Sequence, residues 1–369
     1  MKRTYLMLAL YSSVFIIFGL VFIYSAGISM EARHPGVTAS EFLERQLIAF
    51  AIGLAGALII IYMKGSWHFK RAFTVYYPLT LILLVAVLFF SDRGGSNRWI
   101  DIGSFSLQIS EFAKISLLIV LAKYFGGLKK RNFLTTFLIP LGILAPLAML
   151  VFIEPDLSTT GIMVAITFVM MIIGGIKMQY IGLALIFVVI LILVLYSGGF
   201  IEEYQIQRIT SFLSSFTGEE HEQVSYSLMA ISSGGLTGTG LGMGLVKYYL
   251  PVSYSDFIFA VIGEELGLVG LLVLMLAFVG FIRELIVAGL RGSTALEGKL
   301  YIVGFALYIM IQATINIAVN LGLFPATGVT LPFVSSGGSS IMSLMIGYGL
   351  VFSILIESEE EKEKENEKA

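Results

Sequence analysis

The amino-acid sequence predicts an all-α, polytopic membrane protein with about ten transmembrane helices. Hydrophobic residues make up 57% of the 369-residue chain and charged residues only 13%, whereas soluble domains carry roughly 25% charged residues. Apolar runs long enough to cross a hydrocarbon core of about 30 Å recur along the chain. The net charge of −2 excludes a strongly basic nucleic-acid-binding surface, and the absence of cysteine excludes disulfides and thiolate sites.

Ten apolar runs have about the length that a membrane-spanning helix needs. Gly and Pro interrupt several of them, which a bundle tolerates where neighbouring helices satisfy the backbone. The first run is too long for the apolar region of a cleaved signal peptide, so we expect it to stay in the mature protein. We expect residues 1–356 to form a single membrane domain. The runs lie near residues 4–28, 44–63, 71–90, 110–126, 134–153, 158–175, 179–197, 256–282, 299–321 and 339–356.

The positions of Lys and Arg predict the orientation of these helices. With the N-terminus inside, most of the basic side chains fall in cytoplasmic segments, and both termini are cytoplasmic. One long extracytoplasmic loop, residues 198–255, then joins the seventh and eighth helices, and residues 357–369, "ESEEEKEKENEKA", form an acidic, disordered cytoplasmic tail. The outer segments hold seven basic residues: Arg33, Arg45, Arg93, Arg98, Lys114, Arg208 and Lys247.

The polar strings of the outer segments carry a resemblance to a known family. In order, they are "GGSNRWIDIG", "SEFAKISLLI", "EPDLST", "QRITSFLSS", "SLMAISSGGLTGTGLG", "YLPVSYSDFIFAVIGEELGLVG" and "NLGLFPATGVTLPFVSSGGSS", between Gly94 and Tyr348. This pattern resembles the SEDS family (shape, elongation, division and sporulation). The string "LGMGLVKYYLP", with Lys247, is more similar to its FtsW and SpoVE branch than to its RodA branch.

The resemblance implies a function, a location and partners. It implies a peptidoglycan glycosyltransferase that polymerises lipid II at the outer face of the bacterial plasma membrane. It also implies a transpeptidase partner, a class B penicillin-binding protein, and contacts with other division or elongation proteins. Three strings depart from the family pattern: "VSYS" replaces the usual Glu-Ala-His-Thr, "ISE" replaces Pro-Ser-Glu, and "SGGS" replaces Tyr-Gly-Gly-Ser. The carboxylate of Asp256, directly after "VSYS", is kept.

The chemistry of glycan elongation assigns candidate roles. Lipid II carries an α-linked diphosphate and the product is β-linked, so the reaction inverts the anomeric centre and needs a base for the attacking hydroxyl. Asp256 is our candidate for this base. Cations must hold the developing charge on the diphosphate. The candidate substrate-binding residues are Arg98, Lys114, Arg208, Gln223, Lys247 and Ser339.

Each candidate also has a structural interpretation. Asp256 directly precedes an apolar run and could be a helix N-cap. Arg98 and Lys114 could be interfacial anchors that extend toward lipid headgroups. Glu264 and Glu265 lie too far along the eighth helix to reach the same sugar, and we expect them to pair with an intramembrane cation or donor. The remaining residues with a structural or site-supporting role are Glu111, Glu154, Asp156 and Asn320.

Other polar features have simpler interpretations. Gln312, Asn316 and Asn320 recur every four residues on one face of the ninth helix, which is typical of interhelical hydrogen bonding. In "EPDLST", Asp156 or Ser158 is expected to cap the sixth helix. The glycine-rich "GGLTGTGLGMG" lacks the strand and helix of a dinucleotide site. The three histidines are scattered and give no metal-ligand pattern, although a Mg²⁺ bound by one or two carboxylates beside the diphosphate stays open.

Two other functions compete with the polymerase. A flippase that moves lipid II across the membrane would show internal repeats and polar sites near the midplane, but no convincing repeat is visible and the polar strings gather on one side. A non-catalytic scaffold of a division or elongation complex would leave the outer charges without a role. The sequence therefore favours the enzyme.

Overall fold

The computed structural model of the protein is a bundle of long, mostly apolar helices. It describes residues 2–34, 36–90, 98–102, 105–177, 179–180, 182–183, 206, 210 and 222–368. Its helices are α1 (Lys2–Arg33), α2 (Ala39–Tyr62), α3 (Gly65–Lys70), α4 (Tyr77–Val87), α5 (Ile109–Gly126), α6 (Ile139–Ile153), α7 (Leu157–Ile173), α10 (Glu222–Ser233), α11 (Ile258–Val287), α12 (Leu296–Asn320) and α13 (Gly338–Lys368).

Several short elements extend or join these helices. π-Helical segments precede α4 and α6 and follow α11, and a 3₁₀ turn lies between α10 and α11. Two short strands follow α4. These elements are η1 (Ala72–Tyr76), η2 (Leu134–Leu138), η3 (Val246–Tyr248), η4 (Ala288–Gly292), β1 (Trp99–Ile102) and β2 (Phe105–Gln108).

Six of the described helices are long and apolar enough to cross a membrane, and two shorter apolar helices accompany them. The chain is therefore a multi-pass membrane protein, although ten spans are more than these helices show. The expected seventh span, 179–197, lies almost entirely outside the described residues. The six are Lys2–Arg33, Ala39–Tyr62, Leu134–Ile153, Ile258–Gly292, Leu296–Asn320 and Gly338–Glu367.

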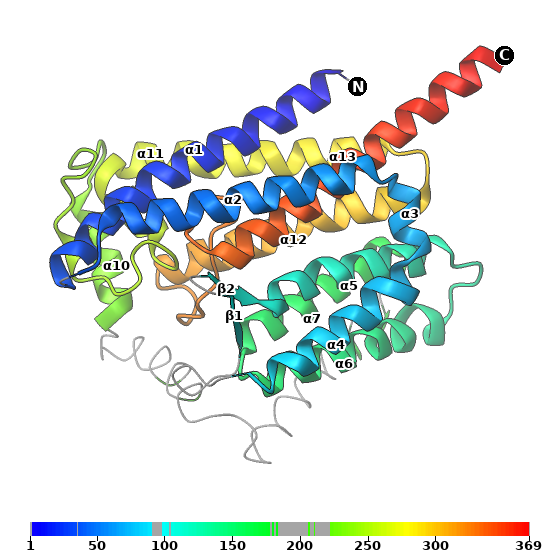
Figure 1. Ribbon diagram of the computed structural model, residues 1–369, viewed down its shortest axis with the longest axis horizontal. Coiled ribbons are helices and arrows are strands. Elements are labelled where there is room, and N and C mark those ends of the chain that lie inside the picture. The colour runs from blue at the N-terminus through cyan, green and yellow to red at the C-terminus, as the bar shows by residue number, and fades with distance from the viewer. Residues whose placement is uncertain are drawn as a thin grey trace.

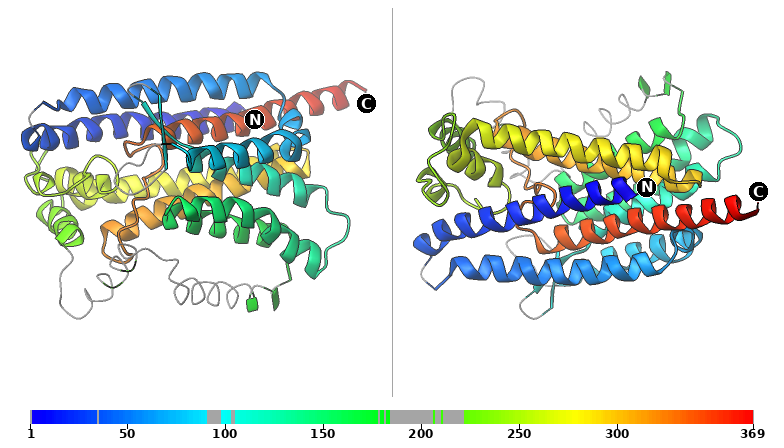
Figure 2. Two further views of the ribbon diagram at one scale, coloured as in Figure 1. Left: turned by 60° about the horizontal axis from the view of Figure 1, so that its bottom comes forward. Right: turned by 90° about the horizontal axis from the view of Figure 1, so that it is seen from above.

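The long helices run roughly along one axis, and both chain termini lie toward the same end of the bundle (Figure 1). We call the opposite end the distal end. Helix α10 lies at this distal end, and the β1–β2 hairpin lies where α5 begins (Figure 1). Views from two further directions show the same arrangement (Figure 2).

Helix α13 is the centre of the bundle. Of its most apolar 18-residue window, 83% is buried inside the protein, against 22% for α2. Small residues allow this packing: a Cβ atom added at Gly349 would come within 2.7 Å of the Cα of Ala57 on α2. Because lipid is as apolar as the helices, close packing of small residues is a main source of association in membranes.

The C-terminal residues differ from the expectation from the sequence. Residues 357–368, expected to be a disordered tail, continue α13 as a helix. The start of this extension is bonded to α3, because the Glu357 carboxylate accepts hydrogen bonds from the amide and the hydroxyl of Ser66 (2.7 and 2.6 Å). The expected all-α class holds for this mostly helical fold, to which β1 and β2 add one short antiparallel hairpin with Trp99 opposite Gln108.

Helix α11 is broken at Gly267, whose φ of 67° is in the left-handed region that favours glycine. The break removes intrahelical hydrogen bonds, and the preceding loop replaces them. The carbonyls of Glu264 and Glu265 accept from the amides of Thr239 (2.9 Å) and Gly240 (3.1 Å). On the other side of the break, the amides of Leu268 and Val269 donate to the carbonyls of Gly235 and Leu236. The glycine-rich loop therefore completes the broken helix.

A buried ion pair fixes the same loop from its other side. Lys247 Nζ lies 2.6 Å from Glu265 Oε1, and neither side chain is exposed. Ser25 of α1 bonds to both partners, and Glu264 accepts from the amides of Val246 (2.6 Å) and Lys247 (3.0 Å). Glu265 therefore has a cation and Glu264 has backbone donors as partners inside the protein, in line with the expectation that the two pair with a cation or donor. The expectation that Lys247 is an outer cation open to a diphosphate is wrong, because Glu265 neutralises it inside the protein.

We predict that Lys247→Met destabilises the protein by about 3 to 5 kcal/mol, because it leaves Glu265 charged, buried and without its cation. The double variant Lys247→Met/Glu265→Gln should lose less than the sum of the two single variants, since the residues are directly coupled. Thermal unfolding of the detergent-solubilised protein measures both effects.

The matched control is Lys64→Met. Lys64 pairs with Glu360 at 3.2 Å, but both side chains are about half exposed, so its loss should cost less than about 1 kcal/mol. Equal unfolding temperatures for Lys247→Met and Lys64→Met would contradict the structural importance of the buried pair.

Candidate functional site

A polar cavity of about 420 Å³ opens among the distal ends of α5, α7, α12 and α13. The β1–β2 hairpin and the turn before α11 complete its wall. It brings together six of the residues predicted from the sequence, which come from five separate stretches of the chain: Arg98, Glu111, Lys114, Asp156, Asp256 and Ser339. The cavity thus combines acidic, basic and hydroxyl groups in one place.

Asp256 lies in the turn before α11, and the helix N-cap is Phe257. The amide of Ala260, in the first turn, donates to Asn320 Oδ1 at 3.0 Å, so an asparagine of α12 caps this helix. The interpretation of Asp256 as the N-cap is therefore wrong. Its carboxylate lines the cavity and accepts a hydrogen bond from Ser255 Oγ at 2.9 Å.

The amide stripe of α12 holds this turn in place. Asn316 Nδ2 and Asn320 Nδ2 both donate to the backbone carbonyl of Asp256, at 3.0 and 2.9 Å. Asn316 also donates to the carbonyl of Val329 (2.7 Å), and Gln312 donates to that of Thr330 (3.1 Å). The predicted polar face thus bonds two loops to α12, and Asn320 supports the site without lining the cavity.

Glu111 and Lys114 form a buried ion pair in the cavity wall. Lys114 Nζ lies 2.7 Å from Glu111 Oε1, and the Lys114 side chain is 1% exposed. The interpretation of Lys114 as an interfacial anchor is therefore wrong, because a side chain that extends to lipid headgroups would be exposed. Within the described part of the chain, Glu111 Oε2 and Gln312 Oε1 are buried without a hydrogen-bond partner. Both residues line the cavity, so a ligand with hydroxyl or amide donors would satisfy them.

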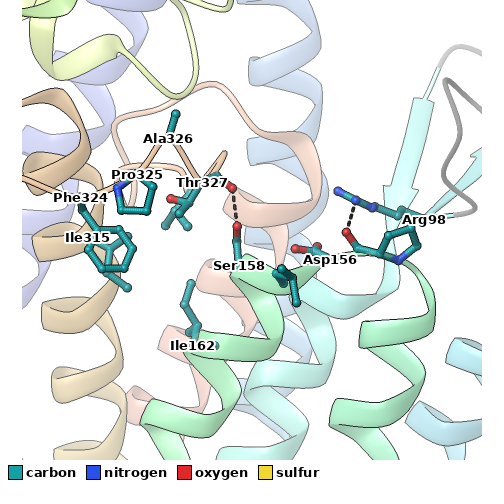
Figure 3. Close-up of a pocket in the computed structure, with 13 residues that line it drawn as sticks. Arg98, Asp156, Ser158, Ile162, Ile315, Phe324, Pro325, Ala326 and Thr327 are labelled. Carbon is teal, nitrogen blue, oxygen red and sulfur yellow. Dashed lines mark hydrogen bonds between the residues drawn. The ribbon is translucent and has the colours of Figure 1, made fainter. Parts of the chain in front are cut away.

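Arg98 is fixed by the backbone of the "EPDLST" segment. Its Nε donates to the carbonyl of Glu154 at 2.6 Å, and its guanidinium also donates to the carbonyl of Pro155 (Figure 3). The predicted cap of α7 is confirmed as Asp156, whose carboxylate accepts from the amide of Thr159 at 3.0 Å. Asp156 also accepts from Gln108 Nε2 at 2.9 Å, which ties the hairpin to this cap.

Glu154 directly follows α6 and is completely buried. Neither carboxylate oxygen has a hydrogen-bond partner among the described residues. Burial, with a smaller contribution from the negative charge of Asp156, raises its pKa to about 8, although the positive charge of Arg98 acts in the opposite direction. Glu154 is not among the residues that line the cavity. It supports the site through its carbonyl, which holds Arg98.

A second, mainly apolar cavity of about 310 Å³ adjoins the first between α7, α12 and the loop after α12. Arg98 and Asp156 line both cavities. The hydroxyl of Ser158 donates to the carbonyl of Thr327 at its wall (Figure 3). An apolar chain attached to a charged group would fit such a pair of adjoining spaces.

Two predicted residues remain. Gln223 is half-buried on α10, away from the residues that line either cavity, and Arg208 lies outside the described residues. The sequence prediction missed Gln108, Tyr254 and Thr330, which also line the polar cavity. Gln108 directly precedes "ISE" and Tyr254 lies within "VSYS", so the strings pointed to the region without identifying these side chains. Among the described residues, no group of three or more His, Asp or Glu could hold a metal ion.

Comparison with known proteins gives the family. A sequence profile described as "Cell cycle protein", covering FtsW, RodA and SpoVE, matches residues 5–360. The chain belongs to this family. It is 34% identical over 366 residues to "Stage V sporulation protein E" of Bacillus subtilis, covering 95% of this chain and 96% of that protein. It is also 36% identical over 358 residues to "Probable peptidoglycan glycosyltransferase FtsW" of Trichlorobacter lovleyi, covering 91% and 89%. The sequence prediction of an FtsW- and SpoVE-like member of the SEDS family is confirmed.

Solved structures of the family share the fold. The Thermus thermophilus rod shape determining protein RodA superposes with a TM-score of 0.71 at 26% identity, covering 95% of this chain and 96% of that one. A chain of a peptidoglycan synthase complex, reported for its coordination of polymerization and crosslinking, superposes with a TM-score of 0.77 at 24% identity, covering 95% and 97%. The latter likeness supports the fold alone.

We predict that the stability of the protein falls as pH rises from about 5 to about 8, in part because of Glu154. Its carboxyl holds a proton in the folded protein up to a pKa of about 8, but the unfolded carboxyl loses it near the usual 4.5. Unfolding therefore releases a proton in this window, and the released proton favours unfolding at higher pH. Glu154→Gln should flatten this dependence and unfold at a higher temperature than the wild type at pH 8. Thermal unfolding between pH 5 and 9 tests it, and parallel profiles of the two proteins would contradict it.

Proposed function

We propose that the chain is a peptidoglycan glycosyltransferase that polymerises lipid II, acting at the outer face of the bacterial plasma membrane. The observation that carries the proposal is the polar cavity, where the carboxylate of Asp256 shares one space with Arg98 and Lys114. Family membership supports it, since relatives such as that of Trichlorobacter lovleyi are named peptidoglycan glycosyltransferases. The clustering of these residues at the distal end also fits a reaction at one membrane surface.

Asp256 is the proposed general base of an inverting reaction. The 4-hydroxyl of the acceptor sugar attacks the anomeric carbon of the donor, a new C–O bond forms with β configuration, and the bond from that carbon to the diphosphate oxygen breaks. The carboxylate takes the hydroxyl proton, and the diphosphate leaves with the bonding electron pair. General-base assistance of this kind typically accelerates a reaction by about 10² to 10⁴. Asn316 and Asn320 hold its backbone carbonyl, and Ser255 Oγ donates to its carboxylate, so both the backbone and the side chain are restrained.

Arg98 and Lys114 are the proposed cationic groups for the diphosphate. Both line the polar cavity, and charge developing on the leaving group is best stabilised by donors that are already in position. Lys114 keeps Glu111 as its partner, so the net charge of this pair is close to zero and the diphosphate would compete with that carboxylate. Ser339 contributes a hydroxyl: its Oγ accepts from the amide of Gln108 at 2.7 Å. Lys247 has no part in this step.

The adjoining apolar cavity suits the first isoprenoid units of the polyprenyl chain. Arg98 and Asp156 stand between the two spaces, so a diphosphate near Arg98 would leave its lipid in the apolar cavity and its sugar in the polar one. A Mg²⁺ ion beside the diphosphate would use the carboxylate oxygens of the polar cavity, which are hard ligands of the kind that Mg²⁺ prefers. A class B penicillin-binding protein is the proposed partner, consistent with the fold shared with a peptidoglycan synthase complex.

We predict that Asp256→Asn lowers glycan polymerisation by a factor on the order of 10² to 10⁴, because it removes the proton acceptor and keeps the size of the side chain. Its melting temperature should stay within a few degrees of wild type, since Asp256 is not the cap of α11. Gel analysis of glycan products made from purified lipid II measures the rate.

Asp101→Asn is the matched control, because Asp101 is an exposed hairpin carboxylate that does not line the cavity. A fully active Asp256→Asn protein would remove Asp256 as the base. A wild-type protein that translocates lipid II but makes no glycan, alone or with its transpeptidase, would instead support a flippase.

A further inference from the structure

The segment between α10 and α11 is unusually poor in charge for a loop expected to lie in water. Residues 223–246 contain no charged side chain. Lys247, the next charged residue, is fully buried and paired with Glu265. Between Glu222 and Asp256, the segment therefore offers no exposed charge.

The middle of this segment exposes large apolar side chains instead. We call residues 234–245 the apolar loop. Its four large apolar side chains are between 58% and 73% exposed: Leu236, Leu241, Met243 and Leu245. Clustered apolar side chains on a protein surface mark a contact with a partner or a membrane.

The backbone of the apolar loop has partners within the protein. Besides the bonds that complete α11 around Gly267, the amide of Gly242 donates to Glu265 Oε2 at 3.0 Å, and that of Met243 donates to the carbonyl of Gly240 at 3.1 Å. Non-helical backbone is tolerated at membrane depth only where protein groups satisfy it. Seven of its twelve backbone amides have partners within the protein, so much of the backbone is satisfied while the large apolar side chains point outward.

The apolar loop continues the lipid-facing surface of α11. The carbonyls of Gly235 and Leu236, in the first part of the loop, accept hydrogen bonds from the amides of Leu268 and Val269. The exposed apolar face of α11 begins at these two residues. That face is contributed by residues about one turn apart. Its exposed members are Leu268, Val269, Leu272, Val273, Leu276 and Val279.

Two stacked tyrosines border the apolar loop. The rings of Tyr226 on α10 and Tyr249 lie 5.6 Å apart, and Tyr249 is 63% exposed. Tyrosine is enriched at membrane–water interfaces because its ring is apolar and its hydroxyl is polar. Their position indicates that the headgroup level of a bilayer lies near the distal end, where Figure 1 shows α10.

We propose that the apolar loop inserts into the bilayer leaflet at the distal end, with Leu236, Leu241, Met243 and Leu245 in contact with lipid acyl chains. The continuity with the lipid-facing side of α11 favours lipid over a protein partner. Insertion would set the height of Lys247, and so of the short segment that leads to Asp256, relative to the membrane surface. The inserted loop would then determine how far the polar cavity lies from the membrane surface.

The test measures the environment of a nitroxide label at position 243. Because the chain has no cysteine, Met243→Cys provides a single labelling site, and Leu241→Cys provides a second one. The full-length protein is placed without partners in nanodiscs of phosphatidylethanolamine and phosphatidylglycerol. Collision of the label with oxygen, which enters hydrocarbon, is compared with collision with a nickel chelate, which stays in water.

Two control sites calibrate the result. Leu276→Cys reports the lipid-facing side of α11, and Ser40→Cys reports an exposed position near the distal end. We expect the ratio of oxygen to nickel collisions at 241 and 243 to resemble that at 276 and to be on the order of tenfold above that at 40, as the partition of apolar and polar solutes dictates. Ratios at 241 and 243 equal to that at 40 would overturn the proposal and leave the apolar loop as a surface for a protein partner. Labels shielded from both probes would overturn it too.

Discussion

The structure depends on one constraint, that polar groups inside an apolar bundle must find partners within the protein. The break of α11 at Gly267 shows it most clearly. The carbonyls and amides released there are taken up by the preceding glycine-rich loop, and the Lys247–Glu265 pair closes the same region from the side of α1. Leaving any of these groups without a partner would cost on the order of 1 to 3 kcal/mol or more. The loop, α1 and α11 therefore form one unit.

The same constraint builds the site. Asn320 caps α11 from α12 and, with Asn316, holds the carbonyl of Asp256, so the carboxylate of Asp256 is not used to start the helix. Arg98 is fixed by the carbonyls of the turn after α6. Amides and backbone groups thus position Asp256 and Arg98, while the carboxylate of Asp156 caps α7 and also lines the cavity.

Several of the buried polar atoms that lack a hydrogen-bond partner among the described residues lie near this cavity. Among the described residues, Glu111 Oε2 and Gln312 Oε1 are buried acceptors without partners, and so is the carboxyl of Glu154 behind Arg98. Orphaned buried acceptors are rare in folded proteins and need an explanation. A bound substrate rich in hydroxyl and amide donors explains the first two, and protonation explains part of the third.

The sequence by itself determined the class of the protein, most of its helices and its family, because hydrophobic length, helical periodicity and ordered motifs are local properties. It also predicted the polar face of α12 and limited the cap of α7 to Asp156 or Ser158. Only the tertiary structure decided which charges meet. Lys247 is near Glu265 in sequence, but its buried ammonium also donates to Ser25 on α1. Asp256, Lys114 and Arg98 are distant in sequence and share one cavity. Partner choice between helices depends on packing across the whole bundle, and a single sequence does not encode it in any local pattern.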